Sequence, residues 1–283
     1  MSTFISAKIV KDSYCLTSPD DPVGVRVTTM ELCYPRYIHS ELMTHRMFSR
    51  CSASSRAIPV EKMIESACVI PDYWGKNKAG MQADGELSEC DKGLAETIWF
   101  DAMICAKSYA RQLSELGVHK QTVNRLIEPF SLMHTVVTST EWENFFSLRI
   151  NSLAQPEMRQ LAERMREAMQ NSNPELLEAG SWHTPYIDER EEPILTFRIK
   201  RSVARCARVS YNLHGSNQRS TLERDVELFN RLVSSKPMHA SPLEHVAIPL
   251  GNSGFCRNFR GWKSLRVVLE EGDSVPGFIA GED

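Results

Sequence analysis

Helix-type hydrophobic patterns follow one another along this sequence and restrict the chain to a helix-rich fold. Gly117 separates the first two helices, and Thr138 and Glu141 have the spacing of a capping box at the start of the third. Six of the predicted helices lie in the later part of the chain, at about 91–115, 119–136, 138–150, 156–170, 197–211 and 221–234. Helix therefore dominates the expected secondary structure.

The remaining segments predict a small sheet beside these helices. Residues 24–33 are rich in β-branched side chains and favour a strand, and a short strand follows His245. A helix is predicted from Pro35 to about Ser49, whereas residues 50–90 contain many breakers. The expected class is α+β, or mixed α/β, with a small and mainly antiparallel sheet.

Composition excludes several classes of protein. The chain has 283 residues, a net charge of -3 and a hydrophobic content of 42%, as expected of a globular protein rather than a non-specific nucleic-acid binder. No apolar run has the length of a membrane span and the first residues lack a signal-peptide core, so we expect a cytoplasmic protein. The eight scattered cysteines predict reduced thiols, and the spacing of histidines and cysteines predicts no metal site.

The stretch MTHRMFSRCSASSRAIP, residues 43–59, combines a His-Arg pair with several serines and two further arginines. His45 shares a helix face with Ile38 and Leu42, so it is either a hydrogen-bonded core histidine or a ligand contact. The serine hydroxyls, loop N–H groups and guanidinium groups suit phosphate oxygens. The alternative is a solvated polar loop.

Three further stretches carry possible binding residues. In 138–155, Arg149 lies among aromatic residues, where it either reaches water or meets a planar ligand with carbonyl acceptors. Arg125 and Glu128 have the spacing of a helical ion pair. In 238–245, MHASPLEH, Ser241 is a candidate N-cap with Glu244 as its partner, and the same helix start is a candidate anion site.

Taken together, these stretches resemble the flavin-dependent thymidylate synthases. The family signature R-H-R-x-x-S-x-N-E-x-S-x-R-Y aligns with residues 44–57, and NFFSLR followed by AQPEMR resembles its N-F-x-x-L-R and A-Q-x-E-I-R segment. ARVSY at 207–211 and HASPLEH at 239–245 look like two motifs that the family places before the signature. The resemblance implies a ThyX-like fold.

The order of these motifs is rotated relative to the family. The chain therefore resembles a circular permutant, with the junction near the strand that joins EHVAIP to VRVTTMELCYPRY. We expect residues 1–190 to supply the signature and the helix bearing the substrate arginine, and residues 191–283 to supply the part that is usually first. Both segments are expected to form one compact domain.

The resemblance implies a flavin- and folate-dependent methylation of a deoxypyrimidine monophosphate, dUMP to dTMP. It implies FAD as cofactor, methylenetetrahydrofolate as co-substrate, NADPH as reductant, and a homotetramer with active sites shared between subunits. By motif position, Arg149 would stabilise the negative charge of the activated base. The substrate contacts implied are Arg125, Ser52, Ser54, Arg56 and Glu41. The FAD contacts implied are Thr44, His45, Arg46, Asn144, Thr138, Thr140, Ser210, His239 and Ser241.

Several positions depart from the family pattern. They are Glu41, Thr44, Cys51, Ser52, Ala57, Thr138 and Thr140. Glu41 stands where the family has a substrate-contacting glutamine, and a carboxylate there would favour a base with an additional N–H donor, such as cytosine. The alternatives are therefore dCMP as substrate, installation of a hydroxymethyl group, a nucleotide- or flavin-binding homologue without turnover, and attack of Cys51 on the base as a thiolate.

Overall fold

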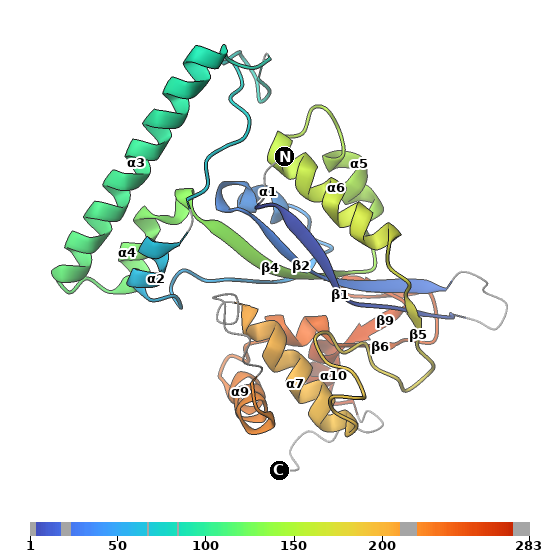
Figure 1. Ribbon diagram of the computed structural model, residues 1–283. Coiled ribbons are helices and arrows are strands. Elements are labelled where there is room, and N and C mark those ends of the chain that lie inside the picture. The colour runs from blue at the N-terminus through green and yellow to red at the C-terminus, as the bar shows by residue number, and fades with distance from the viewer. Residues whose placement is uncertain (1–3, 18–23, 67, 84, 210–219, 274–283) are drawn as a thin grey trace.

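A five-stranded sheet lies at the centre of the fold (Figure 1), in the order β3-β4-β2-β1-β5. The computed structural model describes residues 4–17, 24–66, 68–83, 85–209 and 220–273. The strands are β1 (Ser6–Cys15), β2 (Val25–Pro35), β3 (Ser49–Ser52), β4 (Leu132–Ser139) and β5 (Glu175–Leu176). Neighbours are antiparallel except for β1 and β5. The predicted α+β class with a mainly antiparallel sheet is confirmed.

The two faces of the sheet carry two different layers (Figure 1), because successive side chains of a strand point to opposite sides. On β2, Met30 and Leu32 pack with the helices of the first layer. Val25 and Val27 pack with Trp262 of the second layer. The sheet is therefore buried on both sides over its central strands.

The first layer consists of three helices and a 3-10 turn. They are η1 (Arg36–Ile38), α1 (His39–Leu42), α5 (Glu143–Arg149) and α6 (Pro156–Gln170). On α6, Met158, Leu161 and Met165 recur at helical spacing and are fully buried. This periodic face holds α6 on β1 and β2.

The second layer is built from the C-terminal part of the chain. Its elements are α7 (Leu195–Ala207), α9 (Leu222–Ser234), η4 (Ser241–His245), β6 (Ala247–Pro249), β7 (Phe255–Cys256), β8 (Phe259–Arg260), β9 (Trp262–Ser264) and α10 (Leu265–Glu271). Ile199, Val203, Phe229 and Leu243 form the centre of its core. This layer brings η4 against β3.

A buried ionic cluster joins α7 to α9. The Asp225 carboxylate is fully buried and lies 3.2 to 3.7 Å from the guanidinium groups of Arg201, Arg205 and Arg208. Ser220 donates a hydrogen bond of 2.6 Å to the same carboxylate. These partners offset the loss of hydration that a buried carboxylate suffers.

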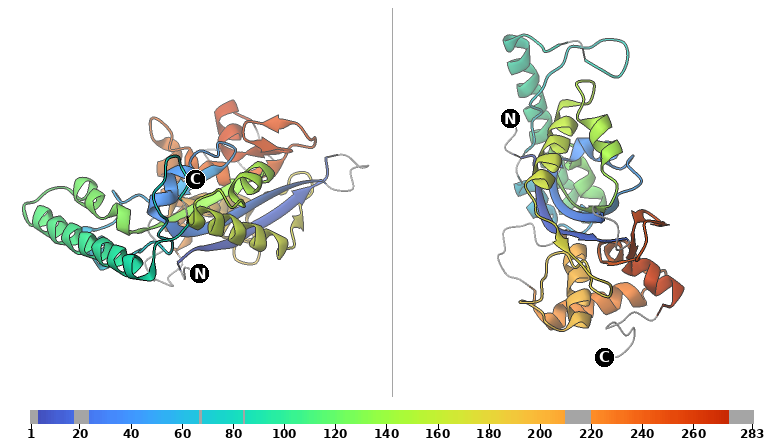
Figure 2. Two further views of the ribbon diagram at one scale, coloured as in Figure 1. Left: turned by 90° about the horizontal axis from the view of Figure 1, so that it is seen from above. Right: turned by 90° about the vertical axis from the view of Figure 1, so that its right-hand side faces the viewer.

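Five helical elements of different lengths lie beyond the β3 edge of the sheet. They are α2 (Val60–Glu65), α3 (Glu89–Glu115), α4 (Lys120–Val123), η2 (Asn124–Leu126) and η3 (Glu128–Phe130). Figures 1 and 2 show α3 projecting from the body of the protein. No helix in the described part of the chain is long and apolar enough to cross a membrane.

Most of the predicted helices are confirmed, with boundaries shifted by a few residues. The predictions at 91–115, 156–170 and 221–234 correspond to α3, α6 and α9. The helix predicted at 197–211 is α7, which ends at Ala207, and residues 210 and 211 lie outside the described part. The strand predicted at 24–33 is β2.

Two predicted helices are wrong in extent. The helix expected from Pro35 to Ser49 ends at Leu42. Beyond this residue the Arg50 guanidinium donates hydrogen bonds to the carbonyls of Leu42, Met43 and His45 at 3.0 to 3.3 Å, and these replace helical backbone bonds. The helix expected at 119–136 is interrupted by short 3-10 turns.

The β-branched run after Leu132 forms β4 instead, between β2 and β3. The capping box is also wrong, because Thr138 lies inside β4 and α5 begins at Glu143 without a side-chain cap. The strand β1 was not predicted, since its lysines and its register shift after Ile9 weaken the alternation.

Candidate functional site

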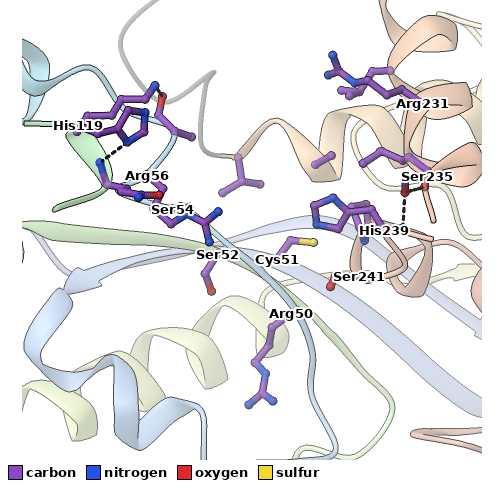
Figure 3. A pocket seen from close by; sticks show the side chains of 18 residues that line it. Arg50, Cys51, Ser52, Ser54, Arg56, His119, Arg231, Ser235, His239 and Ser241 are labelled. Atoms are coloured by element: carbon purple, nitrogen blue, oxygen red, sulfur yellow. Dashed lines mark hydrogen bonds between the residues drawn. The ribbon is translucent and has the colours of Figure 1, made fainter. Parts of the chain in front are cut away.

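A cavity of about 800 Å³ opens between β3 and its following loop on one side and α9 and η4 on the other (Figure 3). The cations that contribute charge to its lining are Arg56, Lys120 and Arg231, and two histidines, His119 and His239, also line it. Arg50 belongs to the lining as well, but its guanidinium turns away from the cavity (Figure 3). No aspartate or glutamate is among the described residues of its lining. In a chain of net charge -3, this local excess of positive charge favours an anionic ligand.

The first wall contains three of the predicted substrate contacts, Ser52, Ser54 and Arg56. Ser52 is the last residue of β3, and its hydroxyl shares a hydrogen bond of 3.0 Å with Thr135. Ser54 and Arg56 lie on the exposed loop beyond it. The structure therefore brings the second half of the signature stretch to the cavity.

Buried polar contacts fix the loop that carries Ser54 and Arg56. The amide nitrogen of Asn124, which is fully buried, donates to the carbonyls of Ser55 and Ile58 at 2.8 and 3.0 Å. The Lys120 ammonium donates to the carbonyl of Ala57 at 3.2 Å. These bonds tie the loop to α4 and η2.

Arg125 does not line this cavity. Its guanidinium donates to both carboxylate oxygens of Glu128, at 2.8 and 3.1 Å. Arg36 donates to the same carboxylate at 2.8 Å, and the Ser55 hydroxyl bonds to it as well. The predicted i,i+3 ion pair is confirmed, and Glu128 gathers three donors beneath the loop.

The second wall is formed by α9 and η4 and contains two predicted FAD contacts, His239 and Ser241. The backbone N–H of His239 donates to the Leu232 carbonyl and the Ser235 hydroxyl, each at 3.0 Å. Both predicted side chains are exposed toward the cavity. Arg231 on α9 lies on this wall as well (Figure 3).

The capping box predicted for HASPLEH is not formed. Ala240 is the N-cap of the 3-10 turn η4, which has no side-chain cap bond. Glu244 pairs with Arg266 instead. His245 points into the fold, where its Nδ1 shares a hydrogen bond of 2.8 Å with the Thr138 hydroxyl. Ser241 is thereby left available at the cavity.

A second group of predicted residues gathers around Arg149 and does not line the cavity. The Nε of Arg149 donates to Nε2 of His45 at 2.9 Å, and its two terminal nitrogens lie 3.3 Å from the Glu41 carboxylate and the Thr44 hydroxyl. Burial, Arg149 and Arg50 lower the pKa of His45 to about 4. His45 is therefore neutral at pH 7 and accepts the bond from Arg149.

Arg46 and Asn144 are exposed and also lie outside the cavity lining. The structure thus divides the predicted site into two regions, the cavity wall and the group around Arg149. Arg50 lies between these two regions. It belongs to the cavity lining, but its guanidinium turns away from the cavity and donates to the carbonyls of Leu42 and His45 (Figure 3).

Thr138 and Thr140 serve the fold in this structure. Thr138 is fully buried, and its hydroxyl shares hydrogen bonds with Thr29 at 2.7 Å and with His245. Thr29 continues this series to Nε2 of His183 at 2.8 Å. Thr140 accepts a hydrogen bond of 2.9 Å from the backbone of Arg260. Ser210 lies outside the described residues.

Cys51 lines the cavity at the end of β3 (Figure 3). Burial and the nearby Glu244 carboxylate raise the pKa of its thiol well above the ordinary value. Because the thiolate is the nucleophilic form, this environment disfavours the hypothesis that Cys51 attacks a base. None of the eight cysteines forms a disulfide, and no cluster in the described part of the chain could hold a metal ion.

Arg231, His119 and Lys120 were not predicted as site residues. They line the cavity from α9 and from the start of α4, and none belongs to a signature stretch. The sequence contains a partial signal only for Arg231, which lies on the helix that leads into HASPLEH. The approach of α4 to β3 depends on tertiary packing.

Comparison with known proteins identifies the family. A family model described as "Thymidylate synthase complementing protein" (Thy1) matches residues 21–175, more than half of the chain. The protein belongs to this family, and the resemblance drawn from the sequence is confirmed. No curated protein matches the chain.

Solved structures with a similar arrangement include two nucleotide-binding enzymes. The UMP/dUMP methylase PolB from Streptomyces cacaoi, bound with 5-Br dUMP, is 16% identical, with a TM-score of 0.48 over 58% of this chain and 89% of that chain. The flavin-dependent thymidylate synthase ThyX from Helicobacter pylori, complexed with FAD and dUMP, is 20% identical, with a TM-score of 0.36 over 50% of this chain and 67% of that chain.

The circular permutation stays a prediction. The segments ARVSY and HASPLEH lie outside the matched residues 21–175. In the structure, Ala247 at the start of β6 and Val25 at the start of β2 pack in the same apolar cluster. In the usual motif order of the family, the strand that begins at Ala247 would lead to the strand that begins at Val25. The starts of these two strands belong to the same apolar cluster here.

Proposed function

We propose that this protein methylates a deoxypyrimidine monophosphate, dUMP to dTMP, with methylenetetrahydrofolate as one-carbon donor, FAD as cofactor and NADPH as reductant. The observation that supports this most strongly is the cavity, whose described lining contains no aspartate or glutamate. It contains Ser54 and Arg56 of the family signature together with His239 and Ser241 of the HASPLEH motif. Two motifs that are far apart in sequence thus meet around one space suited to phosphate groups.

The lining fits both a nucleotide phosphate and a flavin nucleotide. Arg56 offers a guanidinium fork and Ser54 a hydroxyl for the dUMP phosphate. His239 and Ser241 would hold FAD from the opposite wall, and no carboxylate of the described lining repels its phosphates. The cavity volume of about 800 Å³ lies in the range of cofactor sites. Bound FAD, once reduced, would supply the hydride of the reaction.

Arg149 is proposed to stabilise the base when it becomes negatively charged. Because this residue does not line the cavity of its own copy, the proposal needs a second copy to bring an Arg149 to the bound base. We therefore include self-association, as a homotetramer, in the proposed function. Neutral His45 would keep the Arg149 guanidinium oriented, since it accepts the Nε hydrogen at 2.9 Å.

One observation favours dCMP as a second candidate substrate. The Glu41 carboxylate lies 3.3 Å from the Arg149 guanidinium, so the glutamine-to-glutamate departure lies beside the residue proposed to meet the base. A carboxylate accepts hydrogen bonds and does not donate them when ionised, which suits the exocyclic amino group of cytosine. With either base, the proposed product is a nucleotide whose pyrimidine carries a new methyl or hydroxymethyl group.

The decisive experiment incubates the protein with FAD, NADPH, methylenetetrahydrofolate and either dUMP or dCMP, followed by mass measurement of the nucleotide. A gain of CH2 means methylation and a gain of CH2O means hydroxymethylation. Binding of FAD and nucleotide without any mass change would contradict the enzymatic proposal and leave a binding protein.

A matched pair of variants tests the site itself. Arg56→Gln is expected to weaken dUMP binding about 10- to 100-fold, because a charge-assisted hydrogen bond is lost. Arg111→Gln, an exposed arginine on α3, is expected to leave binding unchanged. Equal affinities of the two variants, measured by titration calorimetry, would contradict the assignment of the cavity.

A further inference from the structure

Arg50 stands at a position that the family signature leaves unspecified, the x that follows its first serine in the alignment with residues 44–57. It is the second residue of β3, and successive side chains of a strand point to opposite sides of the sheet. Arg50 therefore faces the first layer, whereas its neighbour Cys51 lies on the other side. This alternation directs the Arg50 guanidinium away from the cavity and toward the turn after α1 (Figure 3).

A single nitrogen of the Arg50 guanidinium holds this turn. Its Nη1 donates to the carbonyls of Leu42, Met43 and His45 at 3.3, 3.0 and 3.1 Å. The last carbonyls of a helix have no partner within the helix, and a cation beside them also interacts favourably with the helix dipole. Three carbonyls thus converge on one charged donor, which constrains the path of the backbone after α1.

The partners of the Arg149 guanidinium come from the same short stretch. The Nε of Arg149 donates to Nε2 of His45 at 2.9 Å, and its terminal nitrogens lie 3.3 Å from Glu41 and Thr44. The Thr44 hydroxyl in turn donates to the backbone carbonyl of Glu41 at 2.7 Å. The backbone that Arg50 holds is therefore the backbone that carries the contacts of Arg149.

We propose that Arg50 is a positioning residue for the methylation proposed above, because it holds the turn whose side chains orient Arg149 toward the base. This inference rests on the proposed function, which assigns Arg149 to the base. Arg50 acts through the backbone in this proposal and contacts no ligand, since its guanidinium points away from the cavity. Its loss should therefore affect turnover more than nucleotide binding.

The tautomer of His45 reports this positioning without any turnover. Burial and the positive charges of Arg149 and Arg50 lower the pKa of the ring to about 4, so it is neutral at pH 7. Because Nε2 accepts a hydrogen bond from Arg149, the hydrogen of the neutral ring lies on Nδ1. Phe145 packs edge-on against the ring, with centroids 4.8 Å apart. Release of the turn would break the bond to Nε2 and allow both tautomers.

The first measurement records the ring nitrogen chemical shifts of His45 by NMR at pH 7, with the signals assigned by their absence in His45→Gln. The wild-type protein is expected to show the Nδ1–H tautomer. Arg50→Met removes the three hydrogen bonds and the charge, and is expected to show a mixture of tautomers. Arg50→Lys keeps a cationic donor and is expected to restore the wild-type spectrum.

Arg26→Met is the matched control. Arg26 is also a half-buried arginine on a strand, and it donates to the backbone carbonyl of Met169 at 2.9 Å and to the Asp12 carboxylate. Its loss removes comparable contacts away from both regions of the candidate site. This variant is expected to lose stability in urea unfolding but to keep the wild-type His45 tautomer.

The second measurement separates turnover from binding, with FAD, NADPH, methylenetetrahydrofolate and dUMP or dCMP. Arg50→Met is expected to lower kcat about 10- to 100-fold and to change the Kd of the nucleotide less than about threefold. Arg50→Lys is expected to recover most of this loss, and Arg26→Met is expected to keep the wild-type kcat. A merely structural role of Arg50 would instead give Arg50→Met and Arg26→Met the same kcat.

Different outcomes overturn different claims. The wild-type tautomer in Arg50→Met shows that Arg50 does not hold the turn, whether or not the protein has activity. A loss of nucleotide affinity in Arg50→Met as large as its loss of kcat would make Arg50 a binding residue and overturn the positioning role. A wild-type protein that converts neither nucleotide overturns the proposed function, and the role of Arg149 with it.

Discussion

Two fully buried histidines are expected to make this protein sensitive to acid. Burial lowers the pKa of His245 to about 3 and that of His183 well below the ordinary value, and Lys11 and His245 lower the latter further. The His245 ring is therefore neutral in the folded protein at pH 5, and burial disfavours the protonated form of His183 in the same way. In the unfolded chain they take up protons below a pH of about 6.5.

The magnitude follows from this difference in proton binding. Because the unfolded state binds more protons below pH 6.5, the stability of the fold is complete above that pH and decreases as the pH falls. At pH 5 the stability that His245 contributes has decreased by about 2 kcal/mol, which is 1.5 pH units at 1.36 kcal/mol per unit. His183 acts in the same direction, because burial lowers its pKa as well. A loss of about 2 kcal/mol is a considerable part of the total stability of an ordinary domain.

Urea unfolding at pH 7 and pH 5, followed by tryptophan fluorescence, measures this loss. His245→Gln removes one titrating group and is expected to reduce the loss between the two pH values by about 2 kcal/mol. Thr138→Val keeps both histidines but removes two buried hydrogen bonds. It should lower stability by about 2 to 4 kcal/mol at both pH values and preserve the difference between them. An identical pH loss in wild-type and His245→Gln would refute the reasoning.

Three further predictions concern single contacts. Asn124→Ala removes both bonds to the loop at 53–58 and should lower stability by about 2 to 3 kcal/mol while weakening dUMP binding; unchanged unfolding in urea would contradict this. Glu41→Gln should shift the ratio of dCMP to dUMP affinity toward dUMP by about tenfold in equilibrium binding, and an unchanged ratio would exclude Glu41 from the base contact. Asp225→Ala leaves the buried Arg201 and Arg205 and the half-buried Arg208 without their shared carboxylate and should cost about 3 to 5 kcal/mol, so a melting temperature equal to wild-type would count against the ionic cluster.

Elements whose apolar faces repeat regularly were predictable from the sequence. On α6, Met158, Leu161 and Met165 recur at helical spacing, and the predicted bounds agree with the structure. Thr138 shows why other elements were not. Its spacing to Glu141 satisfies a local capping rule, but pairing of β4 with β2 and β3 decides its conformation. A pattern that fits two structures is resolved only by tertiary contacts.

The candidate site was predictable to the extent that its residues belong to short motifs. Ser54, Arg56, His239 and Ser241 meet at one cavity, as expected from motifs that act together. Arg231 approaches from α9 and carries no motif, so only the packing of the second layer brings it to the same space. For the same reason, the bond between Arg149 and His45 could not be read from their separation of 104 residues.

The series of hydroxyls between the two buried histidines has a further consequence for where their protons lie. Thr29 and Thr138 each have one hydrogen to donate and lie between two partners, so all hydrogens along the series point in the same direction. If His183 carries its hydrogen on Nε2, then His245 must carry its own on the nitrogen that faces away from Thr138. If His245 donates to Thr138 instead, His183 carries its hydrogen on Nδ1, toward Ser13. The tautomers of the two buried rings are therefore coupled through Thr29 and Thr138, and only two combinations of them satisfy every hydrogen bond of the series.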